Sequence, residues 1–406
     1  MFGGTVLAED YRILVVSPHY FSFTKGLTEA TAKSVTRMEV ILYHNRWTEL
    51  SRLVPAVGDT LPRARRNTLG ELIDNEGTPG NVGIHIANGY FGTFDRKNVA
   101  YGEKMFACMK RTIESKGIKF DLVHGHFVWP WGYVASKISQ EFKVPLVITA
   151  HGHDIYDVPF INDEWRKRTE GILNSASYVT TVSNNNLACM KRLDVRTRAQ
   201  VIPNGYNDAV FHPMDRIECR KRLDLPIDRK IILTAGRLSP EKGQKCLIES
   251  VGEIVLKRKD LICIIIGTGG LKSDLQRTIK LKGLNDSVLL VGGKPHNEIP
   301  LWMNSCDAFI LPSLMEGNPT VMFEALGCGI PFIGTSVGGV PDIITSDEYG
   351  SLCLANDSHG LAEIILAALD KDWKRDRILE YSKNYTWDAI AAQIIPIYKT
   401  CLRSAR

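Results

Sequence analysis

Short runs of Ile, Val and Leu alternate with amphipathic segments along the whole chain. In the first half these runs are RILVVS (12–17), MEVILY (38–43), DLVH (121–124), PLVITA (145–150) and SYVTTV (177–182). In the second half they are KIILTAG (230–236), LICIIIG (261–267), SVLLVGG (287–293), DAFILPS (307–313) and IPFIGT (330–335). Apolar runs without polar alternation predict strands covered on both faces. Their alternation with helical segments predicts parallel sheets, and therefore two doubly wound α/β domains.

The break between the two halves is predicted within VIPNGYNDAVFHPMD (201–215), which carries two prolines and an Asn-Gly turn pair. We therefore expect a first Rossmann-like domain over 1–205 and a second over 206–385. A C-terminal helix within 386–406 is expected to pack back toward the first domain. Ligands of such sheets bind beyond the carboxyl ends of the strands, so two facing sheets would place a cleft between the domains.

Composition narrows the class of protein. The chain has 406 residues with 44% hydrophobic and 23% charged residues, and no apolar run long enough to span a membrane. The N-terminus shows no signal-peptide pattern, which predicts a cytoplasmic protein. A net charge of +5 is too small for a typical nucleic-acid binder. Nine cysteines without a C-x-x-C pair are interpreted as free thiols. The basic run Arg63–Arg66 is either a solvated loop or a contact with lipid headgroups at the inner membrane face.

Two loops of the second half carry residues suited to a phosphate ligand. AGRLSPEKG follows one predicted strand; Gly236 there would let a ligand approach, while Arg237 and Lys242 could neutralise a diphosphate. The alternative is an ordinary loop with exposed basic residues. IIIGTGG ends the next strand at Gly267, but Lys272 stands where the third glycine of a dinucleotide fingerprint belongs.

The stretch LMEGNPTVMFEALGCG (314–329) holds two glutamates, Glu316 and Glu324. We expect a helix from Pro319 to about Leu326, capped by Asn318, with free backbone N–H groups at its start. Glu324 lies among apolar residues and needs a partner, such as two vicinal ribose hydroxyls. The alternative pairs Glu324 with a core Arg or a backbone amide, and Glu316 with a surface residue.

Four histidines follow predicted strands of the first half: His124, His126, His151 and His153. Imidazoles are common metal ligands, but these two H-x-H pairs lack a companion carboxylate-plus-His signature. We therefore predict no metal site. His151, which directly follows PLVITA, is the histidine best placed to face a ligand. Gly26 is interpreted as a turn residue just before a helix that starts near Thr28.

Taken together, these motifs resemble the retaining glycosyltransferases of family 4, also called group 1 glycosyltransferases, which have the GT-B fold of two Rossmann-like domains. The resemblance rests on IPNGYN, GRLSPEKG, GTGG and LPSLMEGNPTVMFEALGCGIPFIGTSVGGVPDII, and its most specific element is the pair Glu316 and Glu324. The phrase EGNPTVMFEALGCGIPF is closest to transferases of teichuronic-acid-type surface polysaccharides. The first domain would then bind the acceptor and the second the nucleotide-sugar donor.

The resemblance implies roles for single residues. Arg237 and Lys242 match the residues that hold the donor diphosphate, and Glu324 matches the glutamate that binds the ribose. Glu316 matches the glutamate that meets the transferred sugar. The backbone of Gly317, Asn318 and Pro319 matches the segment that approaches the sugar and phosphate, and Lys294 lies where the backbone reads the nucleobase. His151 matches the histidine beside the reacting sugar. Many relatives have Gly-Gly where this chain has TKGL, and Gly26 is the residue that corresponds.

The implied function is transfer of a sugar from a nucleoside-diphosphate sugar to a hydroxyl of a glycan or polyprenyl-linked acceptor, with retention at the anomeric carbon. No cofactor and no metal ion are expected. With this function we also expect peripheral contact with a membrane and a role in polysaccharide biosynthesis. Two alternatives stay open: a nucleotide-sugar epimerase or hydrolase on the same fold, and a catalytically dead protein that binds nucleotide sugar or glycan.

Overall fold

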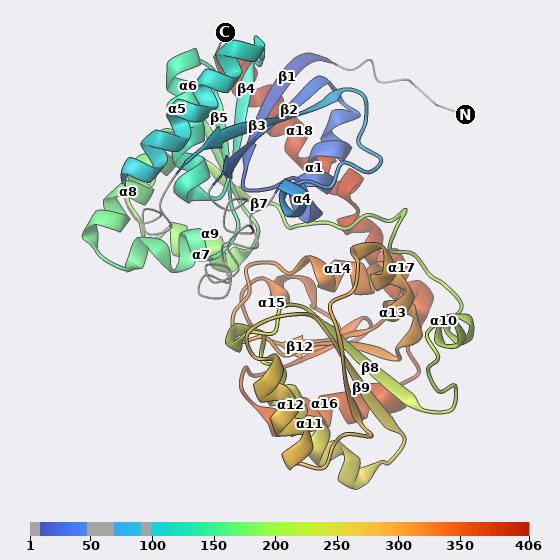
Figure 1. Cartoon of the computed structure of the whole chain (residues 1–406). Coiled ribbons are helices and arrows are strands. Elements are labelled where there is room, and N and C mark those ends of the chain that lie inside the picture. Colours follow the sequence, from blue (N-terminus) through green and yellow to red (C-terminus); the bar gives the residue numbers. More distant parts are fainter. Residues whose placement is uncertain (1–8, 47–68, 91–98, 406) are drawn as a thin grey trace. The chain divides into compact units, whose positions relative to one another are not determined.

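The computed structural model of the chain describes residues 9–46, 69–90 and 99–405 (Figure 1). The chain forms two compact units: Met1–Pro203 together with Trp387–Arg406, and Asn204–Thr386. Within the described ranges no helix is both long and apolar enough to cross a bilayer. The basic run Arg63–Arg66 lies outside the described residues.

The first unit is a parallel seven-stranded sheet in the order β3-β2-β1-β4-β5-β6-β7. Its strands are β1 (Glu9–Ser17), β2 (Val35–Asn45), β3 (Val82–Gly89), β4 (Leu122–His126), β5 (Leu146–Ala150), β6 (Tyr178–Thr181) and β7 (Ala199–Val201). Its α-helices are α1 (Ser22–Ala32), α4 (Leu69–Leu72), α5 (Val99–Lys116), α6 (Tyr133–Phe142), α7 (His153–Tyr156), α8 (Asp163–Asn174), α9 (Asn184–Met190) and α18 (Trp387–Ser404). The interior strands β4 and β5 are buried along their whole length, as expected for a sheet covered on both faces.

The second unit is a parallel six-stranded sheet in the order β10-β9-β8-β11-β12-β13. Its strands are β8 (Lys230–Ala235), β9 (Leu261–Ile266), β10 (Val288–Gly292), β11 (Ala308–Leu311), β12 (Phe332–Thr335) and β13 (Gly350–Cys353). Its α-helices are α10 (Arg216–Arg222), α11 (Gln244–Lys257), α12 (Lys272–Leu281), α13 (Ile299–Ser305), α14 (Thr320–Gly327), α15 (Val340–Ile343), α16 (Ser358–Asp370) and α17 (Arg375–Ser382). The prediction of two doubly wound parallel α/β domains is confirmed.

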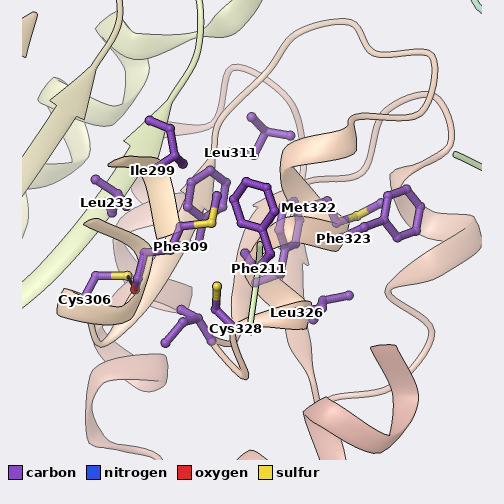
Figure 2. Close-up of a cluster of buried hydrophobic side chains, with 14 of the residues drawn as sticks. Phe211, Leu233, Ile299, Cys306, Phe309, Leu311, Met322, Phe323, Leu326 and Cys328 are labelled. Carbon is purple, nitrogen blue, oxygen red and sulfur yellow. Dashed lines mark hydrogen bonds between the residues drawn. The ribbon is translucent and has the colours of Figure 1, made fainter. Parts of the chain in front are cut away.

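Helix α14 is fixed by the core of the second unit. Figure 2 shows Met322 and Leu326 of this helix among buried side chains that include Phe309 of β11 and Phe211, and all four are at most 1% exposed. Burial of each such side chain contributes about 1.5–3 kcal/mol. This packing sets the position of the helix, and with it the direction of its first backbone N–H groups.

Helix α18 belongs to the first unit and packs on α1. Gly26 lies inside α1, and a Cβ there would stand 2.1 Å from Nε1 of Trp387 in α18. The expectation of a turn at Gly26 is therefore wrong: the helix begins at Ser22, and the glycine makes room for the Trp387 ring. Tyr398 of α18 also contacts the sheet, with its hydroxyl 2.7 Å from Nδ1 of His124.

In the second unit, the chain order reverses beside β8. Strand β9 pairs with one side of β8 and β11 pairs with the other side, so the loops that follow β8 and β11 leave the sheet next to each other. Such a topological switch point is where ligands bind in open α/β sheets. The two loops that the sequence singles out for phosphate and sugar chemistry are the loops that meet here.

Candidate active site

Backbone contacts lock the loop after β8 to the loop after β11. Gly243 adopts a left-handed conformation with φ 65°, and a Cβ there would stand 1.9 Å from the carbonyl oxygen of Pro312. The N–H of Leu314 donates to the carbonyl of Glu241 at 2.8 Å. Only glycine allows this approach. The two loops therefore form one rigid edge on which side chains of both can meet.

At this edge, Lys242 and Glu316 form an ion pair. Lys242 Nζ lies 2.6 Å from Glu316 Oε1, and the hydroxyl of Ser313 donates to the same oxygen at 2.6 Å. The Glu316 side chain is 8% exposed and that of Lys242 27% exposed, so the carboxylate is nearly buried while the ammonium still reaches the surface. An ammonium has three N–H donors, of which this bond uses one. This ion pair agrees with the alternative in which Glu316 pairs with a residue at the surface.

Arg237 lies two residues after β8 and is exposed. Its guanidinium makes no ion pair within the described ranges, and its backbone carbonyl accepts a bond from the Gln244 amide at 2.7 Å. A Cβ on neighbouring Gly236 would meet nothing within 4 Å, so space is open above the strand end. Arg237 thus supplies an exposed positive charge on the same loop as Lys242, with Glu241 of that loop as a partial counter-charge.

The start of α14 differs from the prediction. The helix begins at Thr320 with Pro319 at the cap position, and no side chain caps it, so the expectation that Asn318 caps this helix is wrong. Asn318 is held elsewhere: its side-chain oxygen accepts the N–H of Asn204 at 2.8 Å, and its carbonyl accepts the Asn204 amide at 2.7 Å. The N–H of Met322 donates to the carbonyl of Pro319 at 3.2 Å, while the N–H groups of Thr320 and Val321 have no intrahelical acceptor and stay available for an anion.

Glu324 lies in the second turn of α14 and is 7% exposed. Within the described part of the chain its one close charged neighbour is His296, whose Nε2 is 3.9 Å from Glu324 Oε1. Burial raises the pKa of Glu324 to about 8. The alternative of a core Arg or backbone-amide partner is therefore wrong. The carboxylate is desolvated without a compensating donor, an arrangement that favours a ligand bearing hydroxyls.

The loop after β10 lies at the same end of the sheet as Glu324. Lys294 places its ammonium 5.1 Å from the centroid of the Trp302 ring, and Phe211 stands edge-on to His296 at 5.2 Å. Gly267 after β9 has a different task from ligand approach, because a Cβ there would stand 1.8 Å from the carbonyl oxygen of Gly236. This glycine lets the loop after β9 lie against the loop after β8.

In the first unit, histidines gather at the carboxyl ends of β1, β4 and β5. His126 Nδ1 lies 2.9 Å from His151 Nε2, and the Phe23 ring lies 4.4 Å from the His151 ring. Burial lowers the pKa of His126 and of His151 well below the usual value, and lowers that of His19 to about 4. These imidazoles are therefore neutral at pH 7. His151 is partly exposed, while His126 is 1% exposed.

Asp154 orders the loop that carries His151, a role that the pattern of the sequence did not reveal. Its buried carboxylate accepts the N–H groups of Val128 at 2.8 Å, Gly152 at 2.7 Å and His151 at 3.1 Å. It thus ties the loop after β4 to the loop after β5. The acidic residue of HGHD was a visible signal, because a carboxylate just after a buried strand often caps the turn that follows.

His124 and His153 bond to other partners and take no part in the contact between His126 and His151. His124 bonds to Tyr398 and to Thr149 Oγ1, the latter at 2.7 Å, and His153 pairs with Asp157 at 2.9 Å. Among the described residues no group of three or more His, Cys, Asp or Glu side chains could hold a metal ion. All nine cysteines are free thiols.

Family models match both units. The model described as Glycosyl transferases group 1 matches residues 215–385, and the model described as Glycosyltransferase Family 4 matches residues 66–210. A teichuronic acid biosynthesis glycosyltransferase from Bacillus subtilis (strain 168), named TuaC, is 31% identical over 264 residues, which is 64% of each chain. The chain thus spans just under two thirds of that relative's length. A D-inositol 3-phosphate glycosyltransferase from Corynebacterium efficiens is 26% identical and covers 86% of this chain and 87% of its own.

Solved structures share the fold. A sucrose-phosphate synthase from Thermosynechococcus elongatus superposes with a TM-score of 0.77 at 21% identity, covering 97% of this chain and 100% of its own. Anabaena HepE, solved in complex with UDP, superposes with a TM-score of 0.72 at 19% identity, also over 97% of this chain and 100% of its own. At these identities the superpositions establish the architecture alone. From the family models and this architecture, the chain belongs to the group 1 and family 4 glycosyltransferases of GT-B fold.

Proposed function

We propose that this protein transfers a glycosyl group from a nucleoside-diphosphate sugar to a hydroxyl acceptor, with retention at the anomeric carbon and without a metal ion. The observation that carries the proposal is the combination found at the carboxyl edge of β8 and β11. A nearly buried acid, Glu316, is paired with Lys242 there. A desolvated acid without a matching donor, Glu324, lies in the second turn of the helix that follows, α14.

In the proposed donor complex, the ribose hydroxyls donate to Glu324 and so give the buried carboxylate its missing partners. Arg237, the two remaining N–H groups of Lys242 and the first N–H groups of α14 face the diphosphate. Glu316, tethered to Lys242, meets the hydroxyls of the transferred sugar. HepE, a structural neighbour, has been solved with UDP and with UDP-glucose, which supports a donor of this chemical class.

The proposed reaction breaks the bond between the anomeric carbon and the diphosphate oxygen. Negative charge grows on that oxygen, and the cations of the β8 loop with the dipole of α14 stabilise it because they are already in place. The acceptor oxygen attacks the anomeric carbon from the face that the diphosphate leaves. Its proton passes to the departing phosphate oxygen, so no protein base is needed. Neutral His151 would accept or donate one hydrogen bond to the sugar.

We propose that Arg237 and Lys242 supply the positive charge that a divalent ion supplies in metal-dependent transferases. This proposal predicts a transfer rate that is unchanged by a chelator such as EDTA. A rate that falls with EDTA and recovers with Mg²⁺ or Mn²⁺ would contradict it.

For the acceptor, we propose the hydroxyl of a surface glycan or of a polyprenyl-linked glycan at the cytoplasmic face of the membrane. The support is the similarity to the Bacillus subtilis relative, a teichuronic acid biosynthesis glycosyltransferase. The basic run Arg63–Arg66 would contact anionic lipid headgroups. Co-sedimentation with anionic vesicles, lost when these arginines become Gln, tests the membrane contact.

The decisive experiment measures transfer to acceptor and donor turnover without acceptor in parallel. A panel of nucleoside-diphosphate sugars, screened by thermal stabilisation, first identifies the donor. Glu316→Gln and Arg237→Ala should each lower kcat/KM for transfer by about 10²–10³-fold, since each removes a group aimed at the transition state. Arg277→Ala, which removes a guanidinium that is 74% exposed on α12, serves as the matched control.

Three outcomes decide between transferase, hydrolase and binding protein. Transfer with slow turnover in the absence of acceptor supports the proposal. Rapid donor turnover without acceptor supports the epimerase or hydrolase. Stabilisation by donor without any turnover supports the dead binding protein.

A further inference from the structure

A cavity of about 220 Å³ opens at the amino ends of the strands of the second sheet. Lys230 begins β8, Asp307 directly precedes β11 and Pro331 directly precedes β12, and all three line the cavity. Because these strands are parallel, the cavity lies at the sheet edge opposite to the loops that follow β8 and β11. It is therefore separate from the proposed donor site.

Cations outnumber acids in its lining. The charged lining residues are Arg216, Lys230, Lys371, Arg375, Asp307 and Asp372. Both acids are already neutralised: Asp307 pairs with Arg216 and, at 2.8 Å, with Arg220, while Asp372 pairs with Lys374. Lys371 pairs with Asp347 at 3.2 Å. Two cations, Lys230 and Arg375, make no ion pair in the described ranges, although Asp260 attracts Lys230 and Asp215 attracts Arg375 from a greater distance.

The guanidinium of Arg375 is held in the wall by neutral acceptors alone. Its Nη2 donates to the carbonyl of Cys328 and to Asn304 Oδ1, both at 2.8 Å, while its Nε is buried without an acceptor. Burial lowers the pKa of Arg375. A Cβ on Gly329 would stand 2.6 Å from Cγ of Arg375, so the glycine turn clamps the side chain in place. A desolvated positive charge without a carboxylate in contact is costly, and an anion in the cavity would offset that cost.

A wider hollow of about 420 Å³ continues from the cavity and shares Arg216, Lys230, Asp307 and Arg375 with it. Its rim adds Arg229, whose Nη2 donates to the carbonyl of Leu261 at 2.7 Å. It also adds Asp215, which caps α10, and the exposed Asp228. The hollow gives the two unpaired cations access to solvent.

We propose that this cavity binds the phosphate monoester of a small metabolite. Two cations that no carboxylate contacts suit a phosphate monoester, whose charge is close to −2 at pH 7. The cavity of about 220 Å³ has room for a phosphate with a few attached carbons. The cationic lining and the clamped Arg375 form a site that neither the donor nor the acceptor of the transfer reaction occupies.

The test titrates the full chain with inorganic phosphate and with glycerol 3-phosphate at constant ionic strength, and follows Tm and the heat of binding. Arg237→Ala protein is titrated in parallel, because phosphate could also enter the proposed donor site. Lys230→Gln and Arg375→Gln should each weaken glycerol 3-phosphate binding at least tenfold. Lys282→Gln, which removes an exposed lysine at the end of α12, should leave it unchanged, as should Arg237→Ala.

Lys230→Gln keeps the test independent of folding, because Lys230 makes no ion pair in the described part of the structure and its loss should not unfold the unit. Loss of binding in Arg237→Ala, or binding that Lys230→Gln leaves at full strength, would overturn the proposal. A lipid headgroup offers the same phosphate chemistry. Sedimentation with phosphatidic acid vesicles that Lys230→Gln abolishes, without binding of the soluble ester, would assign the site to a lipid; binding of the soluble ester assigns it to a metabolite.

Discussion

Replacement of Glu324 by Gln should stabilise the ligand-free protein above neutral pH. The pKa of this buried carboxyl stands at about 8 against an ordinary value of 4.5. Between these values the folded protein holds a proton that the unfolded chain has released. The free energy of unfolding therefore falls as pH rises, by about 1.4 kcal/mol per pH unit, and the loss is complete above pH 8.

The accumulated loss at pH 7 amounts to about 3 kcal/mol, and Gln, which has the same shape and no charge, removes it. Glu324→Gln should match the wild type near pH 5 and exceed its Tm by about 6–12 °C at pH 7, for 2–4 °C per kcal/mol in a unit of this size. The loss in the wild type keeps growing until the pH reaches the folded-state pKa of Glu324, about 8. The gain should therefore be largest above pH 7.

Thermal scans of wild type and variant from pH 5 to pH 8.5 measure this effect. Glu348→Gln, at an exposed position of the same unit, is the matched control and should change stability by less than about 0.5 kcal/mol at every pH. The stabilised variant should also bind donor more weakly, because function requires the destabilising charge. A Glu324→Gln protein that is less stable than wild type at pH 8 would refute the reasoning, since it would mean that the carboxylate has a partner in the free protein.

Three further changes test other parts of the structure. Lys242→Met should lower the free energy of unfolding by about 3 kcal/mol in urea, because it leaves the carboxylate of Glu316, which is 8% exposed, without its cation. Adding Glu316→Gln should restore most of the stability but no activity. Equal stability of the single and the double variant would contradict this prediction. Asn204→Ala should cost about 1–3 kcal/mol and raise the donor KM more than it lowers kcat, because the backbone carbonyl of Asn318 loses the side-chain amide of Asn204 as its donor; an unchanged KM would contradict this link. Asp154→Ala, which leaves three N–H groups without acceptors, should lower Tm and broaden the amide signals of the neighbouring loops, and Asp154→Asn should recover part of the loss.

The interior strands and one edge strand, β10, were predictable, and the other three edge strands were not. The apolar runs at 145–150 and 261–267 predicted β5 and β9, which are buried along their whole length. The strands that the pattern missed are β3, β7 and β13, and each lies at the end of a sheet. An edge strand has fewer covering neighbours, so its residues include glycine and polar side chains and its hydrophobic signal is weak.

For the candidate site, residue type and spacing identified charges but not their partners. The loop positions of Lys242 and Glu316 followed from strand ends, which the sheet brings together at the switch point. The capping role assigned to Asn318 was wrong because its partner, Asn204, is 114 residues away in sequence. The sequence around Asn318 gives no indication of a hydrogen bond to a residue so far away along the chain. The imidazole contact between His126 and His151 escaped prediction for the same reason.

The central claim is that the ribose of the donor gives Glu324 its missing partners. Calorimetric titration of the preferred nucleoside diphosphate and of its 2′,3′-dideoxy analogue, on wild type and on Glu324→Ala, tests it most directly. The account predicts that removal of the two hydroxyls weakens binding to the wild type by about 10–100-fold, at 1–3 kcal/mol for the groups left unpaired, and leaves binding to the variant unchanged. Equal weakening in both proteins would contradict the claim.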